Sequence, residues 1–130
     1  MKDTTNQTIP TKTEMDVLQV LWKHGPSTVR FVHDKLNEQK DAVIYTSTLK
    51  LMQVMKEKGM LDRDETHMKH IYRATLEEGK VKVNMLGRFV DSMYDGSASN
   101  LMVALLGSDK TSDKELQKIK ELLNNFDKGK

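Results

Sequence analysis

The sequence has no cysteine among its 130 residues. This absence excludes disulfide bonds, thiolate metal sites and a cysteine nucleophile, and it suits a reducing compartment. Nor does any apolar run approach the roughly 18–20 residues that a membrane-spanning helix needs, so we expect no membrane insertion. The polar N-terminal stretch MKDTTNQTIP lacks the apolar segment of a signal peptide. We therefore expect a cytoplasmic protein.

A large excess of charge of one sign is also missing. The chain has 21 Lys and Arg against 19 Asp and Glu, which gives a net charge of +2. If nucleic acid is the partner, positive charge must be concentrated locally, because phosphate contacts supply most of the non-specific affinity. Hydrophobic residues make up 37% of the chain, which is enough for a compact core.

Motifs of catalysis and of metal binding are absent from the sequence. It contains no glycine-rich phosphate loop, no HExxH and no GxSxG. Its histidines lack the cysteine or carboxylate spacing of a metal site. We therefore expect no catalytic residue, no metal and no cofactor, and we do not expect an enzyme. The histidines are His24, His33, His67 and His70.

What the sequence does contain begins with a helix over residues 12–24. Thr11 and Glu14 make a capping box at its start, and apolar residues recur behind them at helical spacing. Gly25-Pro26 ends the helix. Residues 1–10 form a polar arm before it.

A second helix is predicted over about residues 29–37, capped by Ser27 or Thr28. Its apolar side chains share one stripe, which is expected to be buried, and its basic side chains lie off that stripe. The stripe is Val29, Val32 and Leu36, and the residues expected to point elsewhere are Arg30, His33 and Lys35.

A third helix, over residues 45–58, has a polar face that carries no acid until Glu57. Small polar side chains in its first two turns suit a helix that lies in a DNA major groove. Taken alone, the pattern favours an ordinary solvated amphipathic helix, so the order of elements has to decide. At about 100° per residue, the polar face consists of Thr46, Ser47, Lys50 and Gln53, opposite Thr48, Leu49, Leu51, Met52 and Met55.

Two short strands, over residues 60–63 and 71–76, follow Gly59, because apolar and polar residues alternate there. The polar link between them forms a basic hairpin tip with His67, Lys69 and His70, for which we expect phosphate contacts. Helix, helix, helix, strand, strand is the order of a winged helix-turn-helix.

Thr75 and Glu78 form a second capping box, at which we place a domain boundary. Three further helices follow, and their apolar residues cover more faces than so small a bundle can bury alone. We therefore expect them to form a dimerisation region with a second copy of the chain. Its expected contact residues are Phe89, Met93, Leu101, Leu105, Leu116, Ile119, Leu122 and Leu123.

The predicted fold is mainly α with a small β-hairpin. An N-terminal winged helix-turn-helix domain (residues 11–76) is followed by a C-terminal three-helix dimerisation domain (77–130). Three segments of the chain together resemble the penicillinase-repressor family of bacterial winged-helix regulators, the BlaI/MecI type. They are TEMDVLQVLWKHGPSTVRFVHDKL, IYTSTLKLMQVMKEKGML and HIYRATLEEGKV.

This resemblance implies a homodimer that binds a palindromic double-stranded DNA operator and represses transcription, commonly of antibiotic-resistance genes. The winged helix would contact DNA and the C-terminal helices would dimerise. Positions where the family places operator-facing residues correspond to Tyr45, Thr46, Ser47 and Lys50, and Lys69 and His70 lie on the wing that touches the backbone.

The chain departs from the family pattern in three ways. Val54 stands where such repressors usually have a basic residue. The Asn–Phe bond that a membrane sensor protease cleaves in β-lactam-responsive members aligns with Ala104–Leu105, and Asn100–Leu101 is a shifted candidate. The cysteine-rich tail of the copper-responsive branch is absent, which excludes copper sensing by thiolates.

Two other functions stay open. The winged helix could instead bind another protein, which the near-neutral net charge and Val54 favour slightly. The chain could also be a regulator with a small-molecule pocket between the winged helix and the dimer helices, which the apolar excess around Phe89 and Met93 permits.

Overall fold

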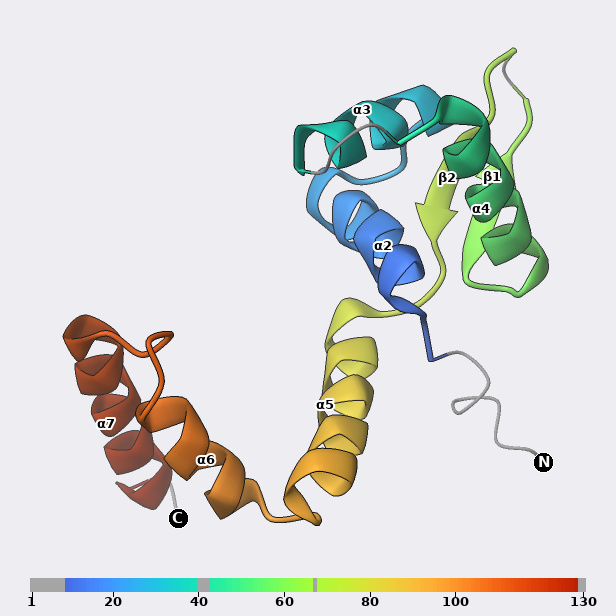
Figure 1. Cartoon of the computed structure of the whole chain (residues 1–130). Coiled ribbons are helices and arrows are strands. Elements are labelled where there is room, and N and C mark those ends of the chain that lie inside the picture. The colour runs from blue at the N-terminus through green and yellow to red at the C-terminus, as the bar shows by residue number, and fades with distance from the viewer. Residues whose placement is uncertain (1–8, 40–42, 67, 129–130) are drawn as a thin grey trace. The chain divides into compact units, whose positions relative to one another are not determined.

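A computed structural model describes residues 9–39, 43–66 and 68–128 of the chain. The chain divides into two compact units, Met1–Asn84 and Met85–Lys130. The first contains α2 (Lys12–His24), α3 (Val29–Gln39), α4 (Tyr45–Glu57), β1 (Leu61–Asp64) and β2 (Ile71–Ala74) (Figure 1). Helix α5 (Glu78–Tyr94) contains the division, and α6 (Ala98–Leu106) and α7 (Asp113–Lys128) lie in the second unit. This is the predicted helical fold with one hairpin, and the domain limits that we assigned stay a prediction.

The local signals at the start and end of α2 are confirmed. Thr11 Oγ1 accepts a hydrogen bond from the backbone N–H of Glu14 at 3.2 Å, and the backbone N–H of Thr11 donates to Glu14 Oε1 at 2.9 Å. Gly25 ends the helix with φ of +85°, a left-handed conformation that costs glycine little. Its N–H donates to the carbonyl of Leu21 at 2.8 Å.

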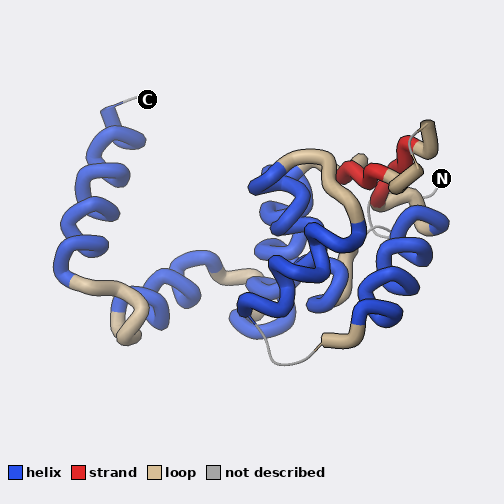
Figure 2. Tube along the Cα trace, turned by 90° about the horizontal axis from the view of Figure 1, so that it is seen from above, coloured by secondary structure: helices blue, strands red, loops and turns tan. Residues whose placement is uncertain are grey.

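The hairpin is antiparallel and pairs Leu61 with Ala74 through to Asp64 with Ile71. Ser27 adds an isolated bridge to it, since the N–H of Ser27 donates to the carbonyl of Tyr72 at 2.9 Å and the N–H of Tyr72 donates back at 2.8 Å. Thr28 therefore caps α3, with its Oγ1 accepting from the N–H of Phe31 at 3.1 Å. The hairpin lies beside the helices in both ribbon views (Figure 2).

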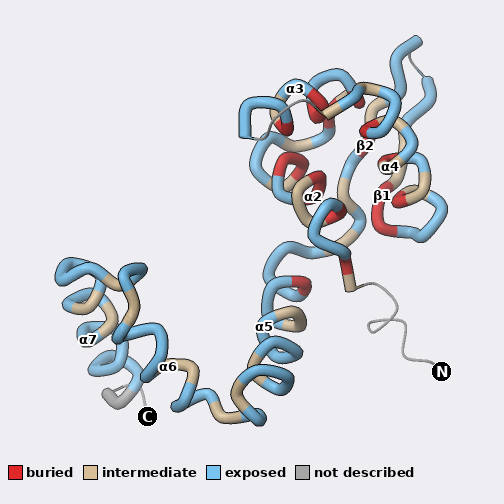
Figure 3. Tube along the Cα trace, viewed as in Figure 1, coloured by how far each residue is buried: buried red, intermediate tan, exposed pale blue. Residues whose placement is uncertain are grey.

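One hydrophobic core joins α2, α3, α4 and the hairpin. Tyr72 on β2 is 1% exposed and belongs to it, and the buried segments face inward from each of these elements (Figure 3). Trp22 packs at the edge of the core, and its Nε1 donates to the carbonyl of Leu76 at 3.0 Å. The other core residues are Val17, Leu18, Val20, Leu21, Val29, Val32, Leu36, Met52, Met55, Met60 and Leu61.

The second predicted capping box, at Thr75 and Glu78, is wrong. Thr75 Oγ1 donates to the carbonyl of Gly59 at 2.5 Å, so its hydroxyl ties the exit of β2 to the end of α4. Helix α5 begins at Glu78 without that cap. The backbone N–H of Thr75 also donates to the carbonyl of Met60 at 3.0 Å, which holds Thr75 beside the start of the hairpin. Its hydroxyl is therefore close to Gly59.

Helix α6 begins three residues earlier than the apolar run Leu101–Leu106 indicates. Ser97 caps it by accepting from the N–H of Asn100 at 3.1 Å. Asp95 and Gly96, with φ of +51° and +79°, form the turn between α5 and this helix. Ser112 caps α7 in the same way, accepting from the N–H of Glu115 at 3.1 Å. None of the described side chains of α6 and α7 is buried.

An ion pair fixes the C-terminal end of α4 to the start of α2. Lys58 Nζ lies 2.6 Å from Glu14 Oε2, and the Glu14 side chain is only 4% exposed. Burial alone would raise the pKa of Glu14, but the hydrogen bonds from Lys58 and from the Thr11 N–H outweigh burial and hold this pKa below its ordinary value of 4.5. The charged form of Glu14 therefore stabilises the folded unit.

Replacing Glu14 with Gln tests this ion pair. We expect the free energy of unfolding at pH 7 to fall by about 1 kcal/mol, because a cap partner and a Lys58 contact that solvent screens are both weakened. Since the folded-state pKa is depressed, the stabilisation is complete above the unfolded-state pKa and is lost as pH falls through the folded-state pKa. Urea unfolding followed by Trp22 fluorescence should show the two proteins converging as the pH falls through the folded-state pKa of Glu14.

The matched control is Glu38→Gln on α3, where the carboxylate is 63% exposed and 3.5 Å from Lys35. This variant should unfold within about 0.5 kcal/mol of the wild type at every pH. A Glu14→Gln deficit that did not shrink as the pH was lowered would contradict the role of the Glu14 charge.

Candidate nucleic-acid interface

Helix α4 places a polar ridge on the outside of the first unit. Its inward side chains, Thr48, Met52 and Met55, are 2%, 0% and 0% exposed. Most of the predicted DNA-facing residues lie on the opposite side. Thr46, Lys50 and Gln53 are exposed there, together with Glu57.

A chain of hydrogen bonds, buried at its end between His33 and Thr48, sets the rotation of α4. The backbone N–H of Val43 donates to Asn37 Oδ1 at 3.0 Å, which leaves Asn37 Nδ2 to donate to His33 Nε2 at 3.0 Å. His33 Nε2 then carries no proton, so Nδ1 carries it and donates to Thr48 Oγ1 at 3.1 Å. Helix α3 thus holds both the entry to α4 and its first turn.

The expectation that His33 points away from the core is therefore wrong. Its side chain is buried, with 6% of the residue exposed, and it also meets the Tyr45 ring edge-on at 5.4 Å between centroids. Burial is tolerated because both ring nitrogens have partners. The polar character of histidine hid this role in the sequence.

A hollow of about 440 Å³ lies between the start of α3, one edge of α4 and the wing. It brings four predicted site residues together: Tyr45 and Gln53 from α4, and Lys69 and His70 from the loop between β1 and β2. No carboxylate is among the described residues that line it. The others are Thr28, Val29, Arg30, Leu49, Arg63, Met68 and Tyr72.

Two arginines of this hollow were not among the predicted site residues. Arg30 Cζ lies 4.2 Å from the centre of the Tyr45 ring, and Arg63 donates to the Tyr72 hydroxyl at 3.2 Å and to Glu65. These hydrogen bonds, the one to Tyr72 first, raise the pKa of Arg63. Arg63 stands between Asp62 and Asp64 on β1, a mixed-charge pattern that gives no signal for a phosphate site. Arg30 gave no signal because Tyr45 is far away in sequence.

The wing carries its basic residues at the tip. Lys69 and His70 are exposed, and Met68 beside them is fully exposed. Hydrogen bonding to Arg63 lowers the pKa of Glu65, which keeps that carboxylate charged and paired with the arginine. The third predicted tip residue, His67, lies outside the described residues.

Ser47 does not join the other predicted residues of α4. It lines a smaller apolar hollow of about 270 Å³ with Leu36, Val43 and Leu51, on the edge of α4 away from the wing. Val54 is half-buried on the helix.

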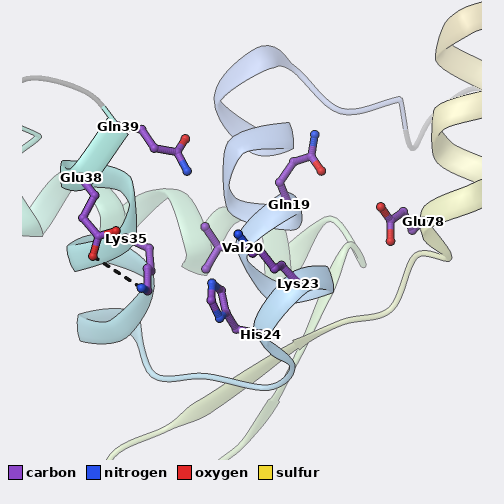
Figure 4. Close-up of a pocket in the computed structure, with 8 residues that line it drawn as sticks. All are labelled: Gln19, Val20, Lys23, His24, Lys35, Glu38, Gln39 and Glu78. Atoms are coloured by element: carbon purple, nitrogen blue, oxygen red, sulfur yellow. Dashed lines mark ion pairs between the residues drawn. The ribbon is translucent and has the colours of Figure 1, made fainter. Parts of the chain in front are cut away.

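A further hollow of about 440 Å³ lies between α2 and α3, with Glu78 at its margin (Figure 4). Its charge is mixed. Lys35 pairs with Glu38 at 3.5 Å inside it, and Glu78 Oε2 accepts from Lys82 at 2.6 Å. Carboxylates among its walls make it a poor phosphate site, unlike the hollow beside α4.

The predicted dimer residues of the second unit are largely exposed in the single chain. Phe89 is 45% exposed, Met93 64%, Leu105 38%, Leu122 52% and Leu123 54%. The remaining ones, Leu101, Leu116 and Ile119, are half-buried. The candidate cleavage residues Asn100 and Ala104 are exposed on α6.

The order of helices, the paired wing strands and the outward polar ridge of α4 define a winged-helix protein. A solved structure described as a MarR family protein from Bacillus stearothermophilus shares this fold, with a TM-score of 0.50 and 19% identity, covering 97% of this chain and 79% of the other.

The sequence profile described as "Penicillinase repressor" matches residues 10–125, so the chain belongs to the penicillinase repressor family. It is 22% identical over 111 residues to the methicillin resistance regulatory protein MecI of Staphylococcus aureus (strain N315), covering 85% of this chain and 89% of MecI. It is also 22% identical to the penicillinase repressor of Bacillus licheniformis, covering 85% of each. The chain is therefore a transcriptional regulator.

Two further findings concern the described part of the chain. Within residues 9–39, 43–66 and 68–128, no helix combines the length and the apolar character that a membrane crossing requires. The same residues contain no group of three His, Cys, Asp or Glu side chains that could hold a metal ion.

The buried hydrogen bond between His33 and Thr48 predicts the effect of Thr48→Val. The substitution keeps the shape of the side chain but leaves His33 Nδ1–H without its acceptor, which should lower the free energy of unfolding by about 1–3 kcal/mol. Urea unfolding followed by Trp22 fluorescence measures this. The same change at exposed Thr46 should lower the free energy of unfolding by less than about 0.5 kcal/mol. Equal losses of stability at the two positions would contradict the role of the hydrogen bond between His33 and Thr48.

Proposed function

We propose that the chain is a sequence-specific DNA-binding repressor that acts as a homodimer on a palindromic operator. The observation that carries this proposal is the polar ridge of α4 beside a hollow whose described walls hold Arg30 and Lys69, besides an Arg63 that is paired with Glu65, and no carboxylate. A ridge of this kind fits the major groove, and the cations beside it fit phosphates. Membership of a repressor family supports the same function.

Within this proposal, the residues of α4 and of the wing have separate roles. Lys50 and Gln53 would contact base edges, since both are exposed on the outer ridge. Thr46 and Ser47 would contact phosphates or base edges, and Tyr45 would contact the operator at the start of α4. His67, Lys69 and His70 would contact phosphates from the wing.

The apolar surface of the second unit supports the homodimer. Phe126 is 68% exposed and Val103 72%, in addition to the predicted contact residues. Such surface is unfavourable in water, by about 25 cal/mol per Å², and a second copy could cover it. A two-fold dimer presents two copies of α4, so its operator should be palindromic, with half-sites about 34 Å or a multiple apart.

The regulated genes and the release of repression belong to the proposal as well. The names of the relatives, which refer to methicillin resistance and penicillinase, favour an antibiotic-resistance or stress gene as the target. Cleavage by a membrane sensor protease at Asn100–Leu101 or Ala104–Leu105 stays a prediction. Both bonds lie within α6, so cleavage would require that helix to unwind.

Selection of bound duplexes from a random-sequence DNA pool tests the DNA-binding proposal. We expect a palindrome to be enriched and its binding to weaken steeply with salt. The double variant Lys50→Glu/Lys69→Glu should reduce affinity at least about tenfold and lower the salt slope by about 1, because Lys69 contacts a phosphate and Lys50 contacts base edges.

The control is Lys23→Glu on α2, in the hollow of mixed charge, and it should bind like the wild type. A chain that enriched no duplex at low salt would refute the proposal and favour a protein-interaction module. If charge reversal at both Lys50 and Lys69 left the DNA affinity unchanged, that result would also refute the proposal.

Leu122→Glu on α7 tests the dimer. The charge would face the partner across an apolar interface, so the variant should sediment as a monomer in analytical ultracentrifugation where the wild type sediments as a dimer. Lys118→Glu adds the same charged group at another exposed position of α7 and should leave the dimer intact. A wild type that is monomeric at every concentration would overturn the homodimer.

A further inference from the structure

We propose that Arg30 contacts a DNA phosphate and that the Tyr45 ring positions it for this contact. The start of α3 would then grip the backbone across the hollow from the wing. This inference rests on the proposed DNA binding and adds to it a residue outside both α4 and the wing.

The stacking of Arg30 on Tyr45 supplies the first argument. Arg30 Cζ lies 4.2 Å from the ring centre, well inside the range of about 6 Å in which a guanidinium interacts favourably with an aromatic face. Arginine stacks in this way while its N–H groups still point outward to an anion. A stacked side chain loses less freedom on binding than a solvated one.

The ring itself is held by the core. His33 meets Tyr45 edge-on at 5.4 Å, and His33 is fixed by Thr48 at 3.1 Å and Asn37 at 3.0 Å. The position of the Arg30 guanidinium is therefore tied to the same hydrogen bonds that set the rotation of α4. A phosphate contact from Arg30 would therefore have a fixed position relative to the exposed polar ridge of α4.

The ion pairs of the first unit supply the second argument. Arg63 is committed to Glu65 and Tyr72, and Arg73 donates to Asp62 at 2.5 Å. Arg30, in contrast, lies 3.9 Å from Asp34 Oδ1, and both side chains are about 60% exposed. A pair at this distance and exposure is weak, so the guanidinium can transfer to a phosphate at little cost.

The place of Arg30 supplies the third argument. It lines the hollow from α3, whereas Lys69 and His70 line it from the wing. The N-terminal end of α4 and the loop between β1 and β2 lie at the same end of the first unit (Figure 1). A sugar-phosphate strand beside α4 would thus meet cations from both elements.

The test uses the full-length chain, a duplex selected from the random pool and a duplex of unrelated sequence. Arg30→Gln should weaken both complexes about tenfold and lower the salt slope by about 0.9, the value for one phosphate contact. A uniform loss on both duplexes identifies a backbone contact. Arg30→Lys keeps the positive charge without the stacking. Its DNA affinity should fall about threefold, and the slope of its salt dependence should stay nearly unchanged.

Variants of Tyr45 separate the stack from the hydroxyl. Tyr45→Phe keeps the aromatic face, so it should bind DNA more tightly than Tyr45→Leu, and Arg30→Gln should still lower its salt slope by about 0.9. Tyr45→Leu should weaken binding, and the loss of affinity caused by Arg30→Gln should be smaller in the Tyr45→Leu background than in the wild type. The control is Arg73→Gln, because Arg73 is already paired with Asp62 outside the hollow, and its salt slope should equal that of the wild type.

The possible results are distinct. If the wild type binds with a steep salt slope and Arg30→Gln leaves that slope unchanged, Arg30 does not contact phosphate although DNA binding stands. If Tyr45→Phe lowers the DNA affinity as much as Tyr45→Leu does, the ring does not position Arg30. If the wild type binds neither duplex, the proposed function fails and this inference fails with it.

Discussion

The hydrogen bonds that run from Val43 through Asn37 and His33 to Thr48 determine which face of α4 is outside. The apolar contacts of this helix come mainly from Met52 and Met55, and methionine adapts to many packings. Hydrophobic burial alone is also non-directional, so it would tolerate some rotation. A turn of about 100°, one residue of a helix, would replace the exposed ridge with a different set of side chains. The directional hydrogen bond between His33 and Thr48 opposes that turn.

The far end of α4 is fixed by a separate set of contacts. Lys58 pairs with Glu14, and the N–H of Met60 donates to the carbonyl of Met55 at 2.9 Å. Gly59, at φ of +85°, turns the chain directly into β1. Because the helix cannot rotate at either end, the hairpin leaves it in a fixed direction, and the tip residues Lys69 and His70 line the same hollow as Tyr45. The hollow thus follows from constraints on α4.

Sequence periodicity was sufficient for the elements and for most of the ridge, because apolar spacing depends only on neighbours along the chain. It failed where a residue has a partner far away in sequence. His33 looked solvent-facing because its acceptor, Thr48, lies on another helix. Thr75 matched a capping box because the competing carbonyl of Gly59 is brought near only by the hairpin. Arg30 and Tyr45 meet through the packing of α3 on α4, which no local pattern encodes.

The low net charge and the exposed apolar surface can be understood together under the proposed function. A chain with a net charge of +2 has little excess positive charge to offer one stretch of DNA, and non-specific affinity grows with the number of phosphates neutralised. Two linked copies double that number, and the second contact benefits from a high effective concentration. The apolar side chains of α5, α6 and α7 would supply the link. Dimerisation would then set the affinity, and the ridge of each α4 would select the sequence.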